Sequence, residues 1–161
     1  MDMRILLFSD SHGYTHNMIK VINKSKDIDM IIHLGDFIKD AFKIKELYKD
    51  IPFEFVPGNN DWTKDYPSEK LLELKGKKVL ITHGHLYNVK YDYQRIILRG
   101  KILKADAVFF GHTHLAEEIF SEGIMILNPG SISIPAQSEK PTYSLVEIKN
   151  DKLVSRFGSP N

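Results

Sequence analysis

The sequence predicts an α/β fold in which two β-sheets stack face to face and helices cover their outer sides. In the first third of the chain, apolar runs of strand length alternate with helical patterns, as they do in a parallel sheet with crossover helices. Further along, three pairs of strand-length runs are each separated by a short turn sequence, which is typical of antiparallel hairpins. A parallel half followed by a more antiparallel half fits two stacked sheets.

Three strands and two helices are expected in the first part of the chain. The runs at 4–8 and 30–34 are dominated by apolar residues, which is typical of strands buried on both faces. A third strand is expected at 53–56, where a Pro-Gly-Asn-Asn-Asp sequence ends it. Between these strands, apolar residues suit helices over 17–26 and 41–49.

The second part of the chain predicts hairpins, one helix and one more strand. The hairpins are expected within 70–82, 117–127 and 143–157, with Lys-Gly, Ser-Glu-Gly and Asn-Asp at their turns. The helix is expected at 91–104 and the strand at 107–110. These elements complete the strands for two sheets.

Length and composition are those of an ordinary globular domain, and we expect one domain over residues 1–161. With 22 basic and 21 acidic residues the net charge is +1, which gives no electrostatic footprint for nucleic acid or a membrane. The absence of cysteine excludes disulfides, thiolate metal sites and cysteine nucleophiles. No apolar run approaches the ~20 residues of a membrane span, and no signal peptide is recognisable, so we expect a cytoplasmic protein.

Five of the predicted strands run into side chains that can bind a metal ion. His112 and His114 follow the strand at 107–110, and residues two apart on an extended chain point to the same side. The carboxyl ends of strands line the functional crevice of open α/β sheets. The full set at the five strand ends is Asp10, His12, Asp36, Asn59, His83, His112 and His114. Imidazole together with carboxylate suits Mn, Fe, Co, Ni or Zn, so the pattern predicts a metal centre.

Each residue of this kind also has a structural interpretation. Asp10 could cap a helix, and Asp36 and Asn59 could shape turns. We expect His16 to be structural, and His33, inside a strand, to lie in the core or behind the ligands. Turn chemistry does not require four histidines at strand ends, and the joint pattern therefore favours a metal site.

The order of these motifs resembles the binuclear metallophosphoesterase (calcineurin-like) family. The motifs are Asp-x-His at 10–12, Gly-Asp at 35–36, Gly-Asn-x-Asp at 58–61, His-Gly-His at 83–85 and Gly-His-x-His at 111–114. The short chain and the Asn-Pro-Gly-Ser sequence at 128–131 resemble the small prokaryotic phosphodiesterase branch of that family. The resemblance implies a four-layer α/β/β/α sandwich of two mixed sheets. It also implies a divalent-metal-dependent phosphoric ester hydrolase, most simply a phosphodiesterase.

The resemblance further implies two divalent ions, which would be Mn, Ni, Fe, Co or Zn. One ligand set would be Asp10, His12, Asp36 and His114, and the other Asp36, Asn59, His83 and His112. Asp36 would bridge the ions, and in this family a metal-bridging hydroxide attacks phosphorus in line.

Position 60 departs from the family pattern. Many members carry a histidine there, which is thought to protonate the leaving group or to stabilise the transition state. Asn60 can bind a phosphate oxygen but cannot deliver a proton at neutral pH. His85, two residues after His83, is a second candidate that could orient substrate or support the ligands. The candidate catalytic residues are thus Asn60 and His85.

A non-catalytic scaffold is the alternative function. A retromer subunit shares the implied fold, and it serves protein assembly with a degraded metal site. Here all seven ligand positions hold residues that can bind metal, which favours the enzyme. We expect a small phosphodiester as the substrate and no membrane or strong nucleic-acid contact, and the sequence leaves a homo-oligomer open.

Overall fold

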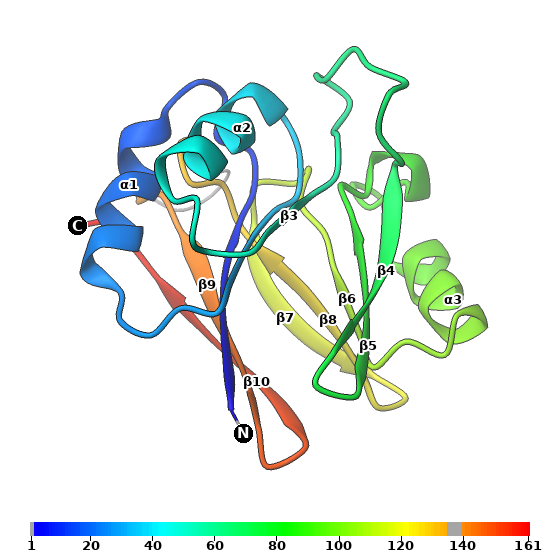
Figure 1. Ribbon diagram of the computed structural model, residues 1–161. Coiled ribbons are helices and arrows are strands. Elements are labelled where there is room, and N and C mark those ends of the chain that lie inside the picture. Colours follow the sequence, from blue (N-terminus) through cyan, green and yellow to red (C-terminus); the bar gives the residue numbers. More distant parts are fainter. Residues whose placement is uncertain (1, 135–139) are drawn as a thin grey trace.

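Two mixed β-sheets lie at the centre of the molecule (Figure 1). The computed structural model describes residues 2–134 and 140–161. Its elements are β1 (Met3–Phe8), α1 (Thr15–Lys24), β2 (Met30–His33), α2 (Ile38–Leu47), β3 (Phe53–Phe55), β4 (Glu69–Leu74), β5 (Lys77–Thr82), the 3₁₀ turn η1 (His85–Tyr87), α3 (Gln94–Ile102), β6 (Ala107–Phe109), β7 (Ala116–Ser121), β8 (Ile124–Pro129), β9 (Tyr143–Lys149) and β10 (Lys152–Gly158). The strand orders are β10-β9-β1-β2-β3 and β4-β5-β6-β8-β7.

The first sheet is built outward from β1. Strand β2 runs parallel to β1 with Phe8 opposite His33, and β3 runs parallel to β2 with His33 opposite Phe55. On the other side, β9 pairs antiparallel with β1 and with β10. Because β1, β2 and β3 run in one direction, the residues that follow them emerge at one edge of the sheet.

The second sheet also has a parallel centre. Strands β5, β6 and β8 are parallel, while β4 and β7 join them antiparallel at the two sides. Ile81 lies opposite Phe109 in this sheet, so the chain leaves β5 and β6 at the same edge.

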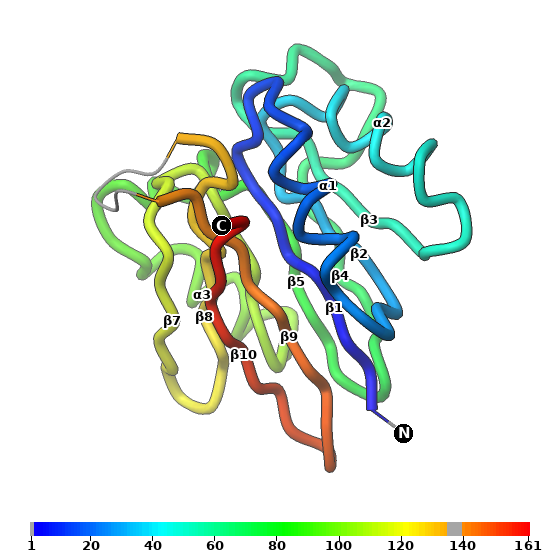
Figure 2. Tube along the Cα trace, turned by 90° about the vertical axis from the view of Figure 1, so that its left-hand side faces the viewer, coloured from blue at the N-terminus to red at the C-terminus, as the bar shows by residue number. Residues whose placement is uncertain are grey.

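Helices cover the outer faces of both sheets, which gives the predicted four layers. Figure 2 shows α1 and α2 along the outer side of the first sheet. Met18 of α1 packs in one cluster with Phe8, and Ile96 of α3 packs in another with Val108 of the second sheet. No helix within the described residues is both long and apolar enough to cross a membrane.

An apolar layer fills the space between the two sheets. Ile5 and Leu7 of β1 belong to it together with Phe109 of β6, whereas Leu6 and Phe8 pack toward the helices. Successive side chains of a strand point to opposite faces, so β1 buries both of its faces. This explains why its sequence is apolar without alternation.

The predicted strands and helices are all present; the strand bounds differ by one or two residues, and the helix starts differ by two or three. Helix α1 begins at Thr15 and α2 at Ile38, before their predicted starts, while α3 begins later, at Gln94. The early start of α2 has a specific cause at the site described next.

Candidate metal centre

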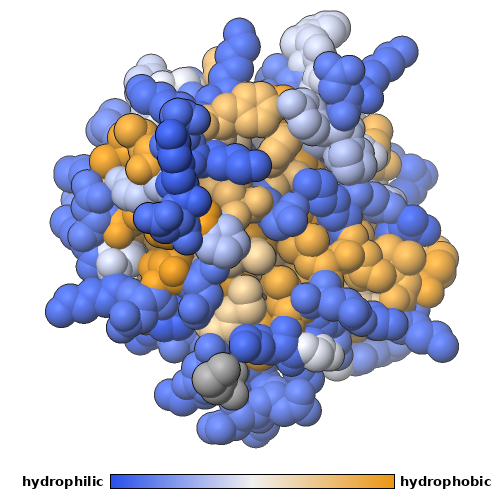
Figure 3. All heavy atoms as spheres, in the orientation of Figure 1, coloured by the Kyte–Doolittle hydropathy of each residue, from blue (hydrophilic) through white to orange (hydrophobic). Residues whose placement is uncertain are grey.

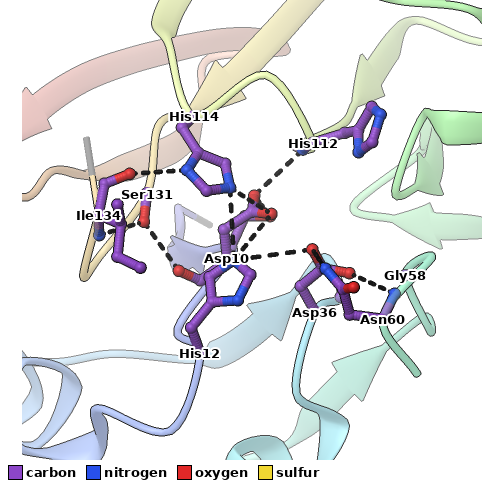
Figure 4. A network of polar contacts seen from close by, with 12 residues as sticks. Asp10, His12, Asp36, Gly58, Asn60, His112, His114, Ser131 and Ile134 are labelled. Carbon is purple, nitrogen blue, oxygen red and sulfur yellow. Dashed lines mark hydrogen bonds and ion pairs between the residues drawn. The ribbon is translucent and has the colours of Figure 1, made fainter. Parts of the chain in front are cut away.

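Asp10 lies at the centre of the candidate site, fully buried just beyond the end of β1 (Figure 4). Its Oδ2 accepts hydrogen bonds from Ser9 Oγ (2.5 Å) and from the backbone N–H of His112 (3.1 Å). Its Oδ1 has no hydrogen-bond partner among the described residues and lies 3.2 Å from His114 Nε2. A buried carboxylate oxygen costs free energy unless something compensates its charge, so this oxygen is suited to a metal ion.

His12, Asp36 and His114 gather around Asp10. One ligand atom from each of the four residues lies within 4.8 Å of the others. His12 Nε2 is 3.3 Å from His114 Nε2 and 3.6 Å from Asp36 Oδ2. Figure 4 shows both imidazoles approaching the Asp10 carboxylate. The structure therefore brings together the four residues that the sequence analysis assigned to one ion, and this donor set suits a divalent transition metal.

The second predicted ligand set lies on the other side of Asp36. His83 Nε2 is 3.4 Å from Asp36 Oδ1 and 3.1 Å from Asn59 Oδ1. The His112 ring centroid is 5.1 Å from that of His83, and Figure 4 shows the His112 imidazole turned away from Asp10. Asp36 thus stands between the two groups, with its two oxygens facing different imidazoles.

Backbone carbonyls orient two of these histidines. His83 Nδ1 lies 2.7 Å from the carbonyl oxygen of Leu34, and His114 Nδ1 lies 2.7 Å from that of Ile134. A carbonyl oxygen can only accept a hydrogen bond, so Nδ1 must carry the hydrogen and donate it. In the neutral ring, Nε2 then keeps the lone pair that a metal ion binds, and histidine ligands are commonly held in this way.

Burial and charge set the protonation of the site. Burial, followed by repulsion from His83, lowers the pKa of His112 to about 4. Burial would raise the pKa of Asp10, but the contact with His114 and the charge of His83 hold that pKa below its ordinary value. The contact with Asp10 in turn raises the pKa of His114. At neutral pH His112 is thus neutral and Asp10 ionised, which are the states that metal binding requires.

Two glycines allow the close approach of these segments. A Cβ at Gly58 would lie 2.2 Å from Asp36 Oδ1, and a Cβ at Gly111 would lie 2.0 Å from Ser9 Oγ and 2.8 Å from Asp10 Oδ2. No side chain fits at those distances. Gly111 therefore lets the segment before the two histidines pass close to Ser9 and Asp10.

The two candidate catalytic residues lie at the rim of the site. Asn60 donates its backbone N–H to Asp36 Oδ1 (3.0 Å) and its side-chain amide to Asp36 Oδ2 (2.8 Å). His85 begins η1, with its ring 5.4 Å from that of His83, and burial lowers its pKa. Its buried Nδ1 has no hydrogen-bond partner among the described residues. Asn60 is thus tied to the central carboxylate, whereas the ring of His85 lies beside that of His83.

The histidines expected to be structural lie outside the ligand groups. His33 is fully buried, where its Nδ1 accepts the backbone N–H of Gly35 (3.1 Å) and its Nε2 lies 2.8 Å from Ser11 Oγ. His33 thus supports the loops after β1 and β2. His16 is exposed on α1.

Asp61 is the residue of the site to which the sequence analysis gave no role. Its Oδ2 accepts the N–H groups of Asp36 (2.9 Å) and Gly58 (2.8 Å), and its Oδ1 accepts those of Phe37 and Ile38 (2.9 Å each). Asp36 and Phe37 have φ angles of 61° and 73°, a left-handed region that few residues other than glycine adopt and that is strained for a bulky side chain such as that of Phe37. Asp61 holds this turn and caps the start of α2, which explains why that helix begins early. Its only signal in the sequence is its place in the Gly-Asn-x-Asp motif.

The whole chain resembles known phosphoesterases. The family model of the calcineurin-like phosphoesterase superfamily domain matches residues 3–151. The chain is 32% identical over 157 residues to YsnB of Bacillus subtilis (strain 168), a probable metallophosphoesterase, with 96% of this chain and 90% of that protein covered. It is 32% identical over 148 residues to the phosphodiesterase MJ0936 of Methanocaldococcus jannaschii, with 80% and 83% covered.

Solved structures show the same fold. An uncharacterised protein of Streptococcus pneumoniae TIGR4, described as a predicted phosphoesterase, superposes with a TM-score of 0.85 at 28% identity, over 99% of this chain and 91% of that chain. Vps29 of Entamoeba histolytica in complex with zinc has a TM-score of 0.74 at 18% identity, over 99% and 100%, which is a likeness of fold alone. The extent of the family match, together with the identity to YsnB, shows that this chain belongs to the calcineurin-like phosphoesterase superfamily.

Proposed function

We propose that this protein is a divalent-metal-dependent phosphodiesterase with a two-metal site. The observation that carries the proposal is the position of Asp36, whose Oδ2 lies 3.6 Å from His12 Nε2 and whose Oδ1 lies 3.4 Å from His83 Nε2. A carboxylate placed between two groups of imidazole and oxygen donors is suited to bridging two ions. Bound there, such ions would supply hydroxide at neutral pH and neutralise charge on the phosphate.

The residues around Asp36 would prepare the site for that chemistry. Asp10 stays ionised, and the carbonyls behind His83 and His114 aim their Nε2 atoms inward. The carboxylate and imidazole donors suit Mn, Ni, Fe, Co or Zn. A phosphodiester substrate is supported by the likeness to a relative named as a phosphodiesterase.

Removal of metal provides the direct test. Hydrolysis of bis(p-nitrophenyl) phosphate should fall to background with a chelator and return when Mn²⁺ or Ni²⁺ is added back. Elemental analysis of the saturated protein should give two ions per chain. Hydrolysis in ¹⁸O-water should place the label on the released phosphoryl group without a burst of product. Activity that survives chelation, a single bound ion, or a trapped phosphoenzyme would each contradict the proposal.

Asn60 leads to a prediction about leaving groups. General-acid catalysis is typically worth 10²–10⁴-fold, and asparagine cannot provide it. We expect kcat/KM to fall steeply as the pKa of the leaving group rises, so that aryl diesters react far faster than alkyl diesters. Asn60→His should flatten that dependence and raise the rates with poor leaving groups.

A series of phenols and alcohols of graded pKa, at saturating metal, measures the slope for both proteins. A flat slope in the unaltered protein would mean that another acid is present. His85→Ala is then the informative variant, because the His85 ring lies 5.4 Å from that of His83 and its Nδ1 has no hydrogen-bond partner in the described part of the chain.

Protein assembly without catalysis is the alternative function. The likeness to Vps29 concerns the fold, which enzymes and non-enzymes can share. The convergence of Asp10, His12, Asp36 and His114 favours the enzyme. A protein that bound two ions but hydrolysed no ester in a panel of diesters, cyclic nucleotides and monoesters would support the alternative.

A further inference from the structure

A groove of about 480 Å³ opens beside the candidate metal centre, formed by α2 and the segment that follows β3. Four aromatic side chains line it, and we refer to it as the aromatic groove: Phe37, Phe42, Trp62 and Tyr66. All four are exposed to solvent. Figure 3 shows hydrophobic side chains spread over the middle of the face seen in Figure 1, with hydrophilic ones around them. An aromatic surface thus adjoins a highly polar site.

The floor of the aromatic groove is already ordered by ring contacts. Phe55 of β3 lies beneath, with its ring centroid 5.2 Å from that of Phe42 and 5.0 Å from that of Tyr66. Phe42 and Tyr66 are 5.7 Å apart. Tilted and edge-to-face pairs at these distances are mutually stabilising. A ligand would therefore meet a preformed surface and would lose little affinity to side-chain ordering.

Trp62 stands at the rim of the groove with 97% of its surface exposed. Tryptophan is highly buried on average in folded proteins, because its large ring gains much from being covered. Trp62 also lies only three positions after the predicted ligand Asn59. A planar group that stacked on this indole would bury apolar area without displacing contacts inside the protein.

Two residues connect the aromatic groove to the metal centre. Asn60 lines the groove and donates hydrogen bonds to both oxygens of Asp36. Phe37 also lines it, and its ring centroid is 5.6 Å from that of His12. A phosphate ester bound at the metal centre would consequently have one of its substituents beside the groove.

The charges of the lining favour a small ligand. Lys39 is basic, whereas Asp61 and Asp65 are acidic. Extended nucleic acids are held mainly by several basic side chains on consecutive phosphates, and this lining offers no such row. A single phosphodiester with a neutral aromatic substituent suits these charges better.

We propose that the aromatic groove binds the nucleobase of a phosphodiester whose phosphate lies at the metal centre. The inference deepens the proposed function and rests on it. Trp62 stacks on the open face of the base, and Phe42 and Tyr66 form the floor below. Stacking of this kind tolerates every base, because each base has a π-face.

Binding of matched phosphate ligands to the Mn²⁺-loaded protein tests the proposal. AMP, ribose 5-phosphate and inorganic phosphate share the phosphate, and only AMP carries a base. We expect calorimetry to show AMP binding about tenfold more tightly than ribose 5-phosphate. AMP should also quench the fluorescence of Trp62, the single tryptophan of the chain, whereas ribose 5-phosphate should not. Phosphate release is followed in the same samples so that hydrolysis of the ligands is detected.

Two variants test whether the groove causes the preference for AMP over ribose 5-phosphate. Trp62→Ala should remove most of the tenfold preference for AMP. Phe120→Ala, which removes an exposed aromatic side chain from β7, is the matched control and should keep that preference.

The possible results distinguish a failure of the nucleobase proposal from a failure of the proposed function on which it rests. If AMP and ribose 5-phosphate bind with equal affinity and inorganic phosphate also binds, the role proposed for the groove is wrong. The proposed function is then unaffected. If phenyl phosphate binds more tightly than inorganic phosphate by the same factor by which AMP exceeds ribose 5-phosphate, that result contradicts the assignment of the groove to a nucleobase. If none of the ligands binds, the proposed function and the inference fail together.

Discussion

Replacement of Asp36 by alanine is expected to abolish hydrolysis of phosphodiesters and to weaken the binding of both metal ions. Its two oxygens face His12 at 3.6 Å and His83 at 3.4 Å, so the substitution removes a ligand from each group at once. Metal ions contribute several kcal/mol of charge stabilisation in such reactions, and their loss should lower kcat/KM by about 10³-fold or more. His114→Ala, by contrast, should weaken mainly one ion.

Metal content by elemental analysis, and the affinity of each ion by titration, measure this difference. His16→Ala removes an exposed histidine from α1 and serves as the control for His114→Ala. An Asp36→Ala protein that still held two ions with unchanged affinity would show that another group bridges them.

Replacement of Asp61 by asparagine is expected to lower the free energy of unfolding by about 2 kcal/mol. One carboxylate oxygen accepts the N–H groups of Asp36 and Gly58, and the other accepts those of Phe37 and Ile38. In either orientation, the asparagine amide presents an NH₂ group to two of these donors. The left-handed turn at Asp36 and Phe37 then loses some of the hydrogen bonds that stabilise it.

Urea unfolding in the presence of a chelator measures the loss without any contribution from bound metal. Asp50→Asn, at an exposed carboxylate after α2, provides the matched control and should change stability little. If both variants unfolded at the same urea concentration, the turn would be held by other contacts.

The sequence predicted the elements of this fold well because central strands such as β1 and β2 bury both faces. Apolar runs such as 4–8 and 30–34 leave no choice of which face is buried, and short turn sequences mark the hairpins. The sheet to which each hairpin belongs could not be predicted in this way. Strand β9 pairs with β1 across most of the chain length, and that pairing depends on packing rather than on any local pattern.

The convergence of the predicted ligands followed from one rule, that parallel strands end at a common edge. That rule predicts neither the role of Asp61 nor the aromatic groove. The role of Asp61 is to accept backbone N–H groups from a turn that lies 23 to 25 positions away in the sequence, and a sequence does not show such contacts. Trp62 looks like any loop residue until its exposure beside Asn60 is known.

The apolar layer between the sheets acts as a spacer for the site. Asp10, Asp36 and Asn59 follow strands of one sheet, whereas His83 and the pair His112 and His114 follow strands of the other. The thickness set by Ile5, Leu7 and Phe109 therefore fixes how far the side chains from one sheet stand from those of the other. Productive sites tolerate errors of only about 0.5 Å. A smaller side chain in this layer should thus alter the affinity for metal, although it is not itself one of the proposed ligands.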